Sequence, residues 1–143
     1  MINMIINEYS YDDIKVGDVF EFKKVVTGKI VDEYAKLTGD FNPLHCDEEY
    51  AKNTEFKGTI VHGMLAASFF STLLGMVCPG KRNLYLTQSL NFKKPIFPNS
   101  EIIIRGIIKD KIESVKIIVV TTQIIYAGAI AVSGEAKIKV RNE

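Results

Sequence analysis

Hydrophobic and polar positions follow a strand-like pattern through the second half of the chain. From residue 84 onward, stretches rich in isoleucine and valine are separated by short polar turns, which is typical of β-strands. The predicted strands cover residues 84–92, 101–109, 112–126 and 129–140, with turns at 98–100, 110–111 and 127–128. Because short connections favour antiparallel neighbours, this half of the chain predicts an antiparallel sheet.

The first half mixes one strand with short helices. Residues 19–26 form a predicted strand, and apolar positions at helical spacing predict a helix over 29–37, with Thr27 as its N-cap. Pro43 disfavours a helical conformation in the residue before it, so this helix should end before Pro43. A second short helix is expected over 47–51.

Residues 58–80 contain no formally charged residue, which raises the question of a membrane span. Only 63–77 reads as helix, and at 1.5 Å per residue it covers roughly 22 Å, whereas a bilayer core is about 30 Å thick. Its apolar side chains point in nearly every direction, so the helix should be enclosed by protein. The sequence therefore predicts an α+β fold in which an antiparallel sheet wraps around a long central helix.

Composition fits one domain spanning residues 1–143, since 47% of the residues are hydrophobic and 24% are charged. The formal net charge of +1 gives no broad field that would attract nucleic acid or an anionic membrane. Two cysteines are too few for a disulfide framework, and residues 1–11 lack the pattern of a secretory signal. A cytoplasmic protein is expected.

Polar residues with catalytic potential concentrate in residues 38–47. Asp40 and His45 would lie roughly 17 Å apart in a fully extended chain, but Asn42 and Pro43 favour a turn that brings them together. A carboxylate and an imidazole sharing one water form a competent general acid/base pair. The alternative is that Asp40 caps a turn and His45 is an ordinary, partly buried histidine. Spacing leaves both interpretations open.

The start of the long helix is a second candidate. Helix N-termini bind anionic oxygen, and Gly63 would let a ligand approach the backbone closely enough for its N–H to stabilise an oxyanion. The alternative is that Gly63 only lets the chain enter the helix. His62 is interpreted as structural rather than catalytic.

Two other motifs are rejected. His45, Cys46 and Asp47 are adjacent in one loop and lack the ligand spacing of a zinc site, so no metal is predicted. Residues 75–81 imitate a phosphate-binding loop, but Arg82 replaces its Ser/Thr and the segment follows a helix rather than a strand.

Residues 34–45, which include Asp-Phe-Asn-Pro-Leu-His at 40–45, closely resemble the hydratase 2 motif of the MaoC-like, (R)-specific enoyl-CoA hydratases. Residues 60–74 resemble the central helix of that family, and 85–95 resemble the strand after it. The resemblance runs from about residue 16 to residue 140. It implies the hot-dog fold, in agreement with the arrangement predicted from the hydrophobic pattern.

The resemblance also implies roles for individual residues. Asp40 and His45 would activate a water that adds to the β-carbon of a short-chain trans-2-enoyl-CoA such as crotonyl-CoA, giving an (R)-3-hydroxyacyl-CoA by syn addition. Asn42 would order the loop, the N–H of Gly63 would bind the thioester oxygen, and Ser71 would support the catalytic loop. The reaction is reversible, so the same site would dehydrate the product.

An acyl-CoA substrate, a homodimer that can form a higher oligomer, and no cofactor or metal are further implications. The basic pairs at 81–82 and 93–94 are typical of solvated turns, and the alternative is that they contact the phosphates of a nucleotide-bearing ligand such as coenzyme A. Candidates for limiting the acyl chain are Leu65, Phe69, Leu74 and Met76. The hot-dog fold also hosts acyl-CoA thioesterases, and a non-catalytic acyl-CoA-binding protein is the third alternative.

Overall fold

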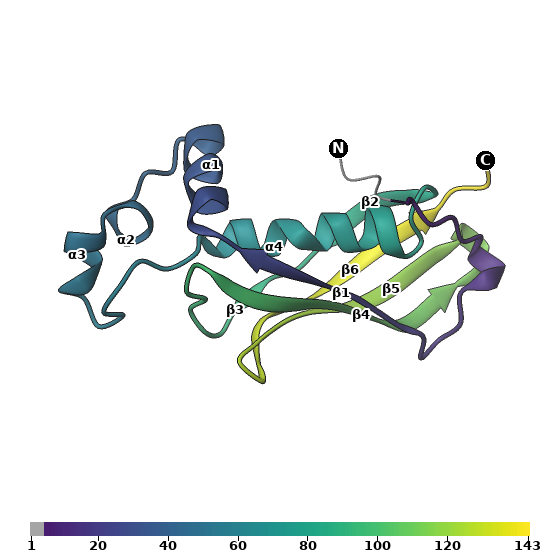
Figure 1. Ribbon diagram of the computed structural model, residues 1–143. Coiled ribbons are helices and arrows are strands. Elements are labelled where there is room, and N and C mark those ends of the chain that lie inside the picture. Colours follow the sequence, from purple (N-terminus) through teal and green to yellow (C-terminus); the bar gives the residue numbers. More distant parts are fainter. Residues whose placement is uncertain (1–4) are drawn as a thin grey trace.

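The computed structural model describes residues 5–143 (Figure 1). The first half contains β1 (Val19–Val26), α1 (Gly28–Thr38), α2 (Pro43–Cys46), α3 (Glu48–Lys52) and α4 (Gly63–Thr72). The second half contains β2 (Asn83–Gln88), β3 (Asn91–Phe92), β4 (Ser100–Ile112), β5 (Ile117–Tyr126) and β6 (Ala129–Val140). Residues 1–4 lie outside the described residues. The predictions that concern them are the start of the domain at residue 1 and the lack of a signal pattern in residues 1–11.

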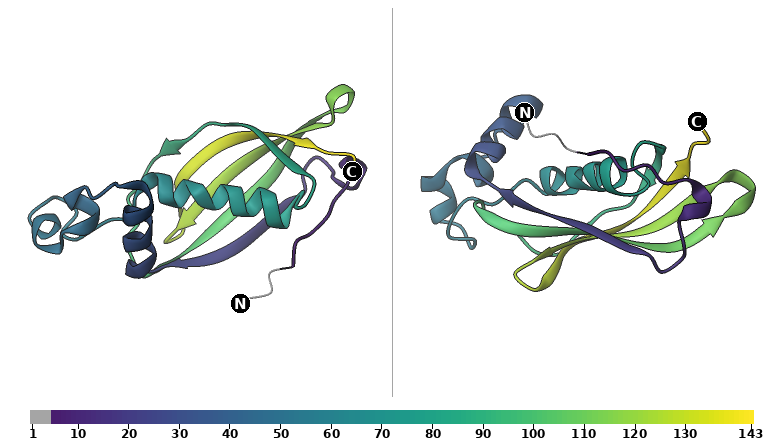
Figure 2. Two further views of the ribbon diagram at one scale, coloured as in Figure 1. Left: turned by 90° about the horizontal axis from the view of Figure 1, so that it is seen from above. Right: turned by 45° about the vertical axis from the view of Figure 1, so that its right-hand side comes forward.

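The strands within residues 5–143 form one antiparallel sheet in the order β1-β4-β5-β6-β2, and β3 also pairs with β6. α4 lies along the concave face of this curved sheet, while α1, α2 and α3 project beyond one end (Figures 1 and 2). This is the predicted α+β, hot-dog arrangement. Isoleucine and valine side chains on the concave face pack against α4 and fill the core.

α4 confirms the helix predicted over 63–77, because its last turn continues as a wider π-helical turn, Leu73–Val77. On its inner face, side chains that include Leu65 and Phe70 are buried in the core. The opposite face is uncovered, with Met64 57% exposed and Ser68 and Ser71 also exposed. The expectation that protein of the same chain encloses this helix on all sides is therefore wrong, because the sheet covers one face only.

The N-terminal segment closes the far end of this helix. The backbone N–H of Asn7 donates to the carbonyl of Met76 at 3.0 Å, and its side-chain amide donates to the carbonyl of Val77 at 2.9 Å. The N–H of Tyr9 donates to the carbonyl of Pro79 at 3.0 Å. The two bonds of Asn7 satisfy carbonyl groups that a helix C-terminus leaves without intrahelical donors, and the bond of Tyr9 holds the chain just beyond it.

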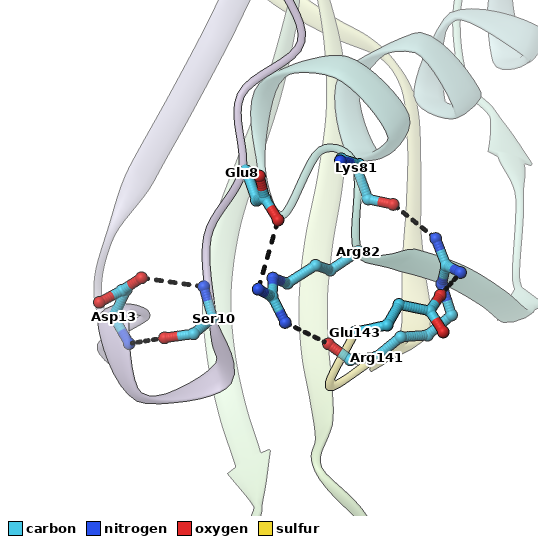
Figure 3. A network of polar contacts seen from close by, with 7 residues as sticks. All are labelled: Glu8, Ser10, Asp13, Lys81, Arg82, Arg141 and Glu143. Atoms are coloured by element: carbon cyan, nitrogen blue, oxygen red, sulfur yellow. Dashed lines mark hydrogen bonds and ion pairs between the residues drawn. The ribbon is translucent and has the colours of Figure 1, made fainter.

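A polar network ties the same end to the C-terminal strand (Figure 3). The guanidinium of Arg82 lies 3.3 Å from the carboxylate of Glu8 and donates to the carbonyl of Arg141. Arg141 in turn donates to the carbonyl of Lys81 and pairs with Glu143. Arg82 is thus a structural link between the N-terminal segment, the start of β2 and the end of β6.

The turn predicted at 110–111 is wrong. β4 continues to Ile112, and the chain reverses through a 3₁₀ turn, Glu113–Val115, followed by Lys116 in the left-handed conformation. Residues 110–111 remain paired with β5, and the register shift between Ile108 and Asp110 marks a β-bulge. A bulge accommodates one extra residue and lets the polar pair stay within the strand.

The strand predicted over 84–92 is divided into β2 and β3, which both pair with β6. Between them the carbonyl of Ser89 comes so close to Gly134 that a Cβ there would lie 1.8 Å from the oxygen. Glycine at 134 thus permits a close backbone approach that no other residue allows. Among residues 5–143, no helix is long and apolar enough to span a membrane.

Candidate active site

The catalytic candidates lie where α1 passes into α2. Thr27 caps α1 as predicted, accepting the N–H of Ile30, and Gly39 ends the helix in the left-handed conformation with φ 81°. The carboxylate of Asp40 then accepts the N–H of Asn42 at 3.2 Å. Asp40 is therefore both the cap of a turn and an exposed carboxylate at the site, so the two interpretations of this residue are compatible.

Asn42 and Pro43 together begin α2. The side-chain oxygen of Asn42 accepts the N–H of Leu44 at 3.0 Å, and Pro43 occupies the first turn, where its missing N–H costs nothing. His45 consequently projects from a short helix. The expectation that His45 and Cys46 lie in a loop is wrong, because the Asn-Pro pair starts a helix instead of only turning the chain.

Backbone contacts fix the ring of His45. Its Nδ1 lies 2.8 Å from the carbonyl oxygen of Ile60, an acceptor, so Nδ1 carries the proton. In the neutral imidazole this leaves Nε2 with a free lone pair. In this tautomer Nε2 of His45 can accept a proton, as a general base must.

The turn brings the two candidate bases together. One carboxylate oxygen of Asp40 and one ring nitrogen each of His45 and His62 all lie within 4.8 Å of one another. A single water oxygen can bridge groups at this separation with ordinary hydrogen bonds. The prediction that the chain turns to place Asp40 beside His45 is confirmed as geometry.

His62 belongs to the same cluster. It is only 2% exposed, its Nε2 lies 3.1 Å from the backbone carbonyl of Asp40, and its ring stacks on His45 with centroids 4.1 Å apart. Tyr34 also lies against His62, with ring centroids 4.8 Å apart. The sequence predicts a structural role for His62. The structure places His62 in contact with both Asp40 and His45, and its position in the sequence directly before Gly63 gives no indication of these contacts.

The cluster of Asp40, His45 and His62 is poorly arranged for a metal ion. Nδ1 of His45 and Nε2 of His62 are already engaged by backbone carbonyls. Each ring therefore has only one nitrogen left for a metal ion. Because one nitrogen of each histidine is committed to a carbonyl acceptor, the cluster suits proton transfer better than metal binding.

Gly63 is the first residue of α4, and helix geometry leaves its N–H without an intrahelical acceptor. It follows His62 directly, and His62 contacts both Asp40 and His45, so this donor lies near these two residues in space. A Cβ at Gly63 would lie 2.9 Å from the ring of Phe92. The absence of a side chain thus lets Phe92 pack against the start of the helix.

A cavity of about 430 Å³ runs along the uncovered face of α4. Its lining residues are Tyr34, Met64, Ala67, Ser68, Ser71, Tyr85, Gln88 and Leu90. Tyr34 also contacts His62, so the cavity begins beside the catalytic cluster. Ser71 lies in the cavity wall about 12 Å along the helix from Gly63, not at the catalytic loop of the same chain.

The residues predicted to limit the acyl chain are not those that line this cavity. Leu65 and Leu74 are buried on the inner face of α4, and Phe69 and Met76 also lie outside the lining. The sequence alone does not tell which face of an all-apolar helix the sheet covers, so it does not show which of these residues face a pocket.

The two basic pairs, 81–82 and 93–94, differ in whether their side chains are free to contact a ligand. Arg82 is committed to Glu8 and to the carbonyl of Arg141, at the far end of α4 from Gly63. Lys93 and Lys94 are exposed and directly follow Phe92, the residue that packs against Gly63. Of the two pairs, only 93–94 lies beside the start of α4.

Comparisons with known proteins agree with this geometry. The MaoC like domain family matches residues 14–129. An (R)-specific enoyl-CoA hydratase from Aeromonas caviae is 43% identical over 131 residues, covering 91% of this chain and 98% of the relative. An (R)-specific enoyl-CoA hydratase from Rhodospirillum rubrum is 34% identical over 134 residues, covering 91% and 90%.

Solved structures give the same result. The (R)-hydratase of A. caviae involved in PHA biosynthesis superposes with a TM-score of 0.87 at 43% identity, over 89% of this chain and 97% of that one. An unliganded R-hydratase from Pseudomonas aeruginosa superposes with a TM-score of 0.92 at 29% identity, over 96% and 89%. The similarity covers nearly the full length of both proteins.

Proposed function

The chain belongs to the MaoC-like domain family, and we propose that it is an (R)-specific enoyl-CoA hydratase. It adds water reversibly to short-chain trans-2-enoyl-CoA, of which crotonyl-CoA is the simplest example. The single observation that carries this proposal is that a ring nitrogen of His45 lies within 4.8 Å of a carboxylate oxygen of Asp40, while the carbonyl of Ile60 holds Nδ1 of that ring. The relatives named above support the reaction class.

Asp40 and His45 hold the reacting water between them. The water donates a hydrogen bond to the Asp40 carboxylate and gives its other proton to Nε2 of His45 as its oxygen attacks the β-carbon. General base assistance of this kind contributes about 10²–10⁴-fold to a rate. Asn42 keeps the loop in shape by accepting the N–H of Leu44.

Attack at the β-carbon pushes electrons onto the thioester oxygen, which becomes an enolate oxygen. The N–H of Gly63 donates to this oxygen, and the positive end of the α4 dipole stabilises the growing charge. The donor is fixed by the helix, so no reorganisation is needed when the charge forms. Ser71 is a supporting residue in the wall of the acyl cavity.

The proton taken from water returns to the α-carbon and completes the reaction. One O–H bond of water and the carbon–carbon π bond break, while C–O and C–H bonds form. Because one cluster both takes and returns the proton, both bonds form on the same face of the substrate. The product is an (R)-3-hydroxyacyl-CoA, and the reverse steps dehydrate it.

The cavity along α4 is the proposed acyl site, and Lys93 and Lys94 are the proposed contacts for the coenzyme A phosphates. The uncovered face of α4, with Met64 57% exposed, is the proposed position of a second copy in a homodimer. One domain spanning residues 1–143, a cytoplasmic location and no cofactor or metal complete the proposal. Size-exclusion chromatography with light scattering tests the dimer, and assays with a chelator test the metal independence.

The decisive experiment mixes the protein with crotonyl-CoA and follows loss of the enoyl absorbance. An (R)-specific 3-hydroxyacyl-CoA dehydrogenase then identifies the enantiomer of the product. Hydration that yields only the (R) form supports the proposal. No absorbance change with any short- or medium-chain enoyl-CoA would remove it.

The alternatives are separated in the same experiment. A hot-dog thioesterase releases free coenzyme A, which a thiol reagent detects, whereas a hydratase leaves the thioester intact. A non-catalytic acyl-CoA-binding protein binds crotonyl-CoA and changes neither signal. The pairing of Asp40 with a free His45 Nε2 favours hydration over hydrolysis.

A further inference from the structure

We propose that His62 is a positioning residue, a neutral imidazole that fixes the backbone of Asp40 and supports the ring of His45. The inference deepens the proposed hydratase function and rests on it, because that function gives Asp40 and His45 their roles. His62 reaches both through separate contacts.

The first contact sets the tautomer of His62. Its Nε2 lies 3.1 Å from the carbonyl oxygen of Asp40, which can only accept, so Nε2 carries the proton. This bond crosses 22 residues of sequence and holds the backbone of the residue whose carboxylate contacts the water. The position of Asp40 therefore depends on a buried ring at the entry to α4.

The second nitrogen shows why the ring is neutral. Nδ1 is buried and has no hydrogen-bond partner among the described residues. As a bare lone pair it costs little, whereas a protonated Nδ1 would place an N–H and a positive charge where nothing accepts them. Burial lowers the pKa of His62 below its ordinary value of 6.5, in the same direction.

The contact between the rings of His62 and His45 explains why a neutral His62 favours the reaction. The titratable groups facing the His62 ring are Tyr34 of α1, Asp40 of the following loop and His45 of α2. His45 must accept a proton during hydration, with ring centroids only 4.1 Å apart. A charged His62 would oppose that step by like-charge repulsion, whereas a neutral ring presents a polarisable face to the imidazolium.

The test uses the fact that the chain has two histidines. Nitrogen-15 NMR of the histidine-labelled wild-type protein gives two imidazoles, and His62→Gln identifies which belongs to His62. We expect His62 to stay in the neutral form with its proton on Nε2 at the pH of the assay. A protonated Nδ1 on His62 would overturn the proposal, and this measurement does not depend on activity.

Two variants separate the two contacts. His62→Gln keeps an N–H donor in place of Nε2 but removes the ring, and His62→Phe keeps a ring but removes the donor. For each, kcat on crotonyl-CoA should fall about tenfold to a hundredfold while KM changes little, as expected for misplaced catalytic groups. Wild-type kcat in either variant would contradict the proposal, since the contact that it lacks would then be dispensable.

A matched control distinguishes positioning from general loss of stability. Ile118→Val shortens a fully buried side chain in the part of the core near the other end of the molecule. It should lower the thermal midpoint and leave kcat unchanged. If the wild-type protein hydrates no enoyl-CoA, the proposed function fails, whereas the NMR measurement still decides whether His62 is neutral.

Discussion

The imidazole of His45 donates its Nδ1–H to the carbonyl oxygen of Ile60 across 2.8 Å. Ile60 lies on the segment that leads into α4, and the N–H of Ile60 donates back to the carbonyl of Leu44. Two bonds therefore lock α2 to the chain that enters the central helix. The base on α2 and the amide at Gly63 keep a fixed relation because the same segment holds both.

This bond can be separated from the basic function of His45. His45→Asn retains an N–H donor near the position of Nδ1 but has no Nε2, whereas His45→Ala loses both. Both variants should reduce kcat/KM by about 10²–10⁴-fold. Only His45→Ala should also lose about 1 kcal/mol of stability, the contribution of a typical hydrogen bond. Equal stabilities in urea unfolding would show that the Ile60 bond contributes nothing.

Asp40→Asn should abolish turnover while substrate binding survives. The asparagine side-chain oxygen can still accept the N–H of Asn42, so the loop keeps its turn. Calorimetry with the unreactive butyryl-CoA should give a dissociation constant close to that of the wild type. Asp32→Asn, which changes an exposed acidic residue of α1, is the control and should keep its activity. Wild-type turnover by Asp40→Asn would exclude a role for the Asp40 carboxylate in holding the reacting water.

The free energy of unfolding should fall in mild acid because of His62. The pKa of His62 is lowered in the folded protein by burial, so between that value and the ordinary 6.5 the unfolded chain binds more protons. Stability is therefore complete above the ordinary pKa and is lost as pH falls through 6.5, by at most about 1.4 kcal/mol per pH unit.

Urea unfolding from about pH 8 to about pH 5, at one protein concentration, measures this dependence. His62→Gln should be less stable than the wild type at the upper end and should lose less on acidification. Parallel pH dependences of the two proteins would contradict the assignment of the acid sensitivity to His62.

The two cysteines should differ in reactivity. Burial raises the pKa of the Cys78 thiol to about 12, and Cys78 is only 7% exposed, so it carries almost no thiolate. Cys46 is exposed, and partial desolvation of its thiol together with the negative charges of Asp32 and Asp40 raises its pKa above the ordinary value. A thiol reagent near pH 8 should modify one cysteine in the native protein and both in denaturant. Cys46→Ser should remove the native reaction and give a clean background for the thioesterase assay.

Gly63→Ala should reduce activity through a steric effect. The added methyl would lie 2.9 Å from the Phe92 ring, which is the exposed end of a side chain and can move aside. We expect the variant to fold, with kcat lowered about 10²-fold by a displaced oxyanion donor. The double variant Gly63→Ala, Phe92→Ala removes the clash. Recovery of activity in the double variant would assign the defect to Phe92, whereas a persistent loss would assign it to the methyl group at the thioester site.

The hydrophobic pattern predicts the strands, the long helix and α1 because each carries a strong periodic or capping signal. Thr27 at the N-cap and Gly39 in the left-handed conformation bound α1 as the rules of helix termini require. α2 is missed because it has four residues, too few for any period to appear. The turn near Lys116 is missed because a lysine in the left-handed conformation is not a sequence signal for a turn.

The site is predictable only in part. Asp40, Asn42 and Gly63 carry local signals, since a carboxylate, a capping side chain and a glycine each act within a few residues. The contact of His62 with Asp40 spans 22 residues and depends on how α4 meets α1, which no local pattern records. The uncovered face of α4 is likewise a consequence of packing and not of composition.

The hydrogen bonds of Asn7 and Tyr9 hold the far end of the central helix, while His62 and Ile60 hold the near end. Because both ends of the helix are held by hydrogen bonds, the helix cannot shift along its own axis. The distance between the Gly63 amide and the loop that carries Asp40 and His45 thus depends partly on Asn7 and Tyr9. These residues lie about 20 Å away along the helix and have no chemical role in the proposed hydration. The N-terminal segment thus helps to fix the position of the proposed oxyanion donor along the helix axis.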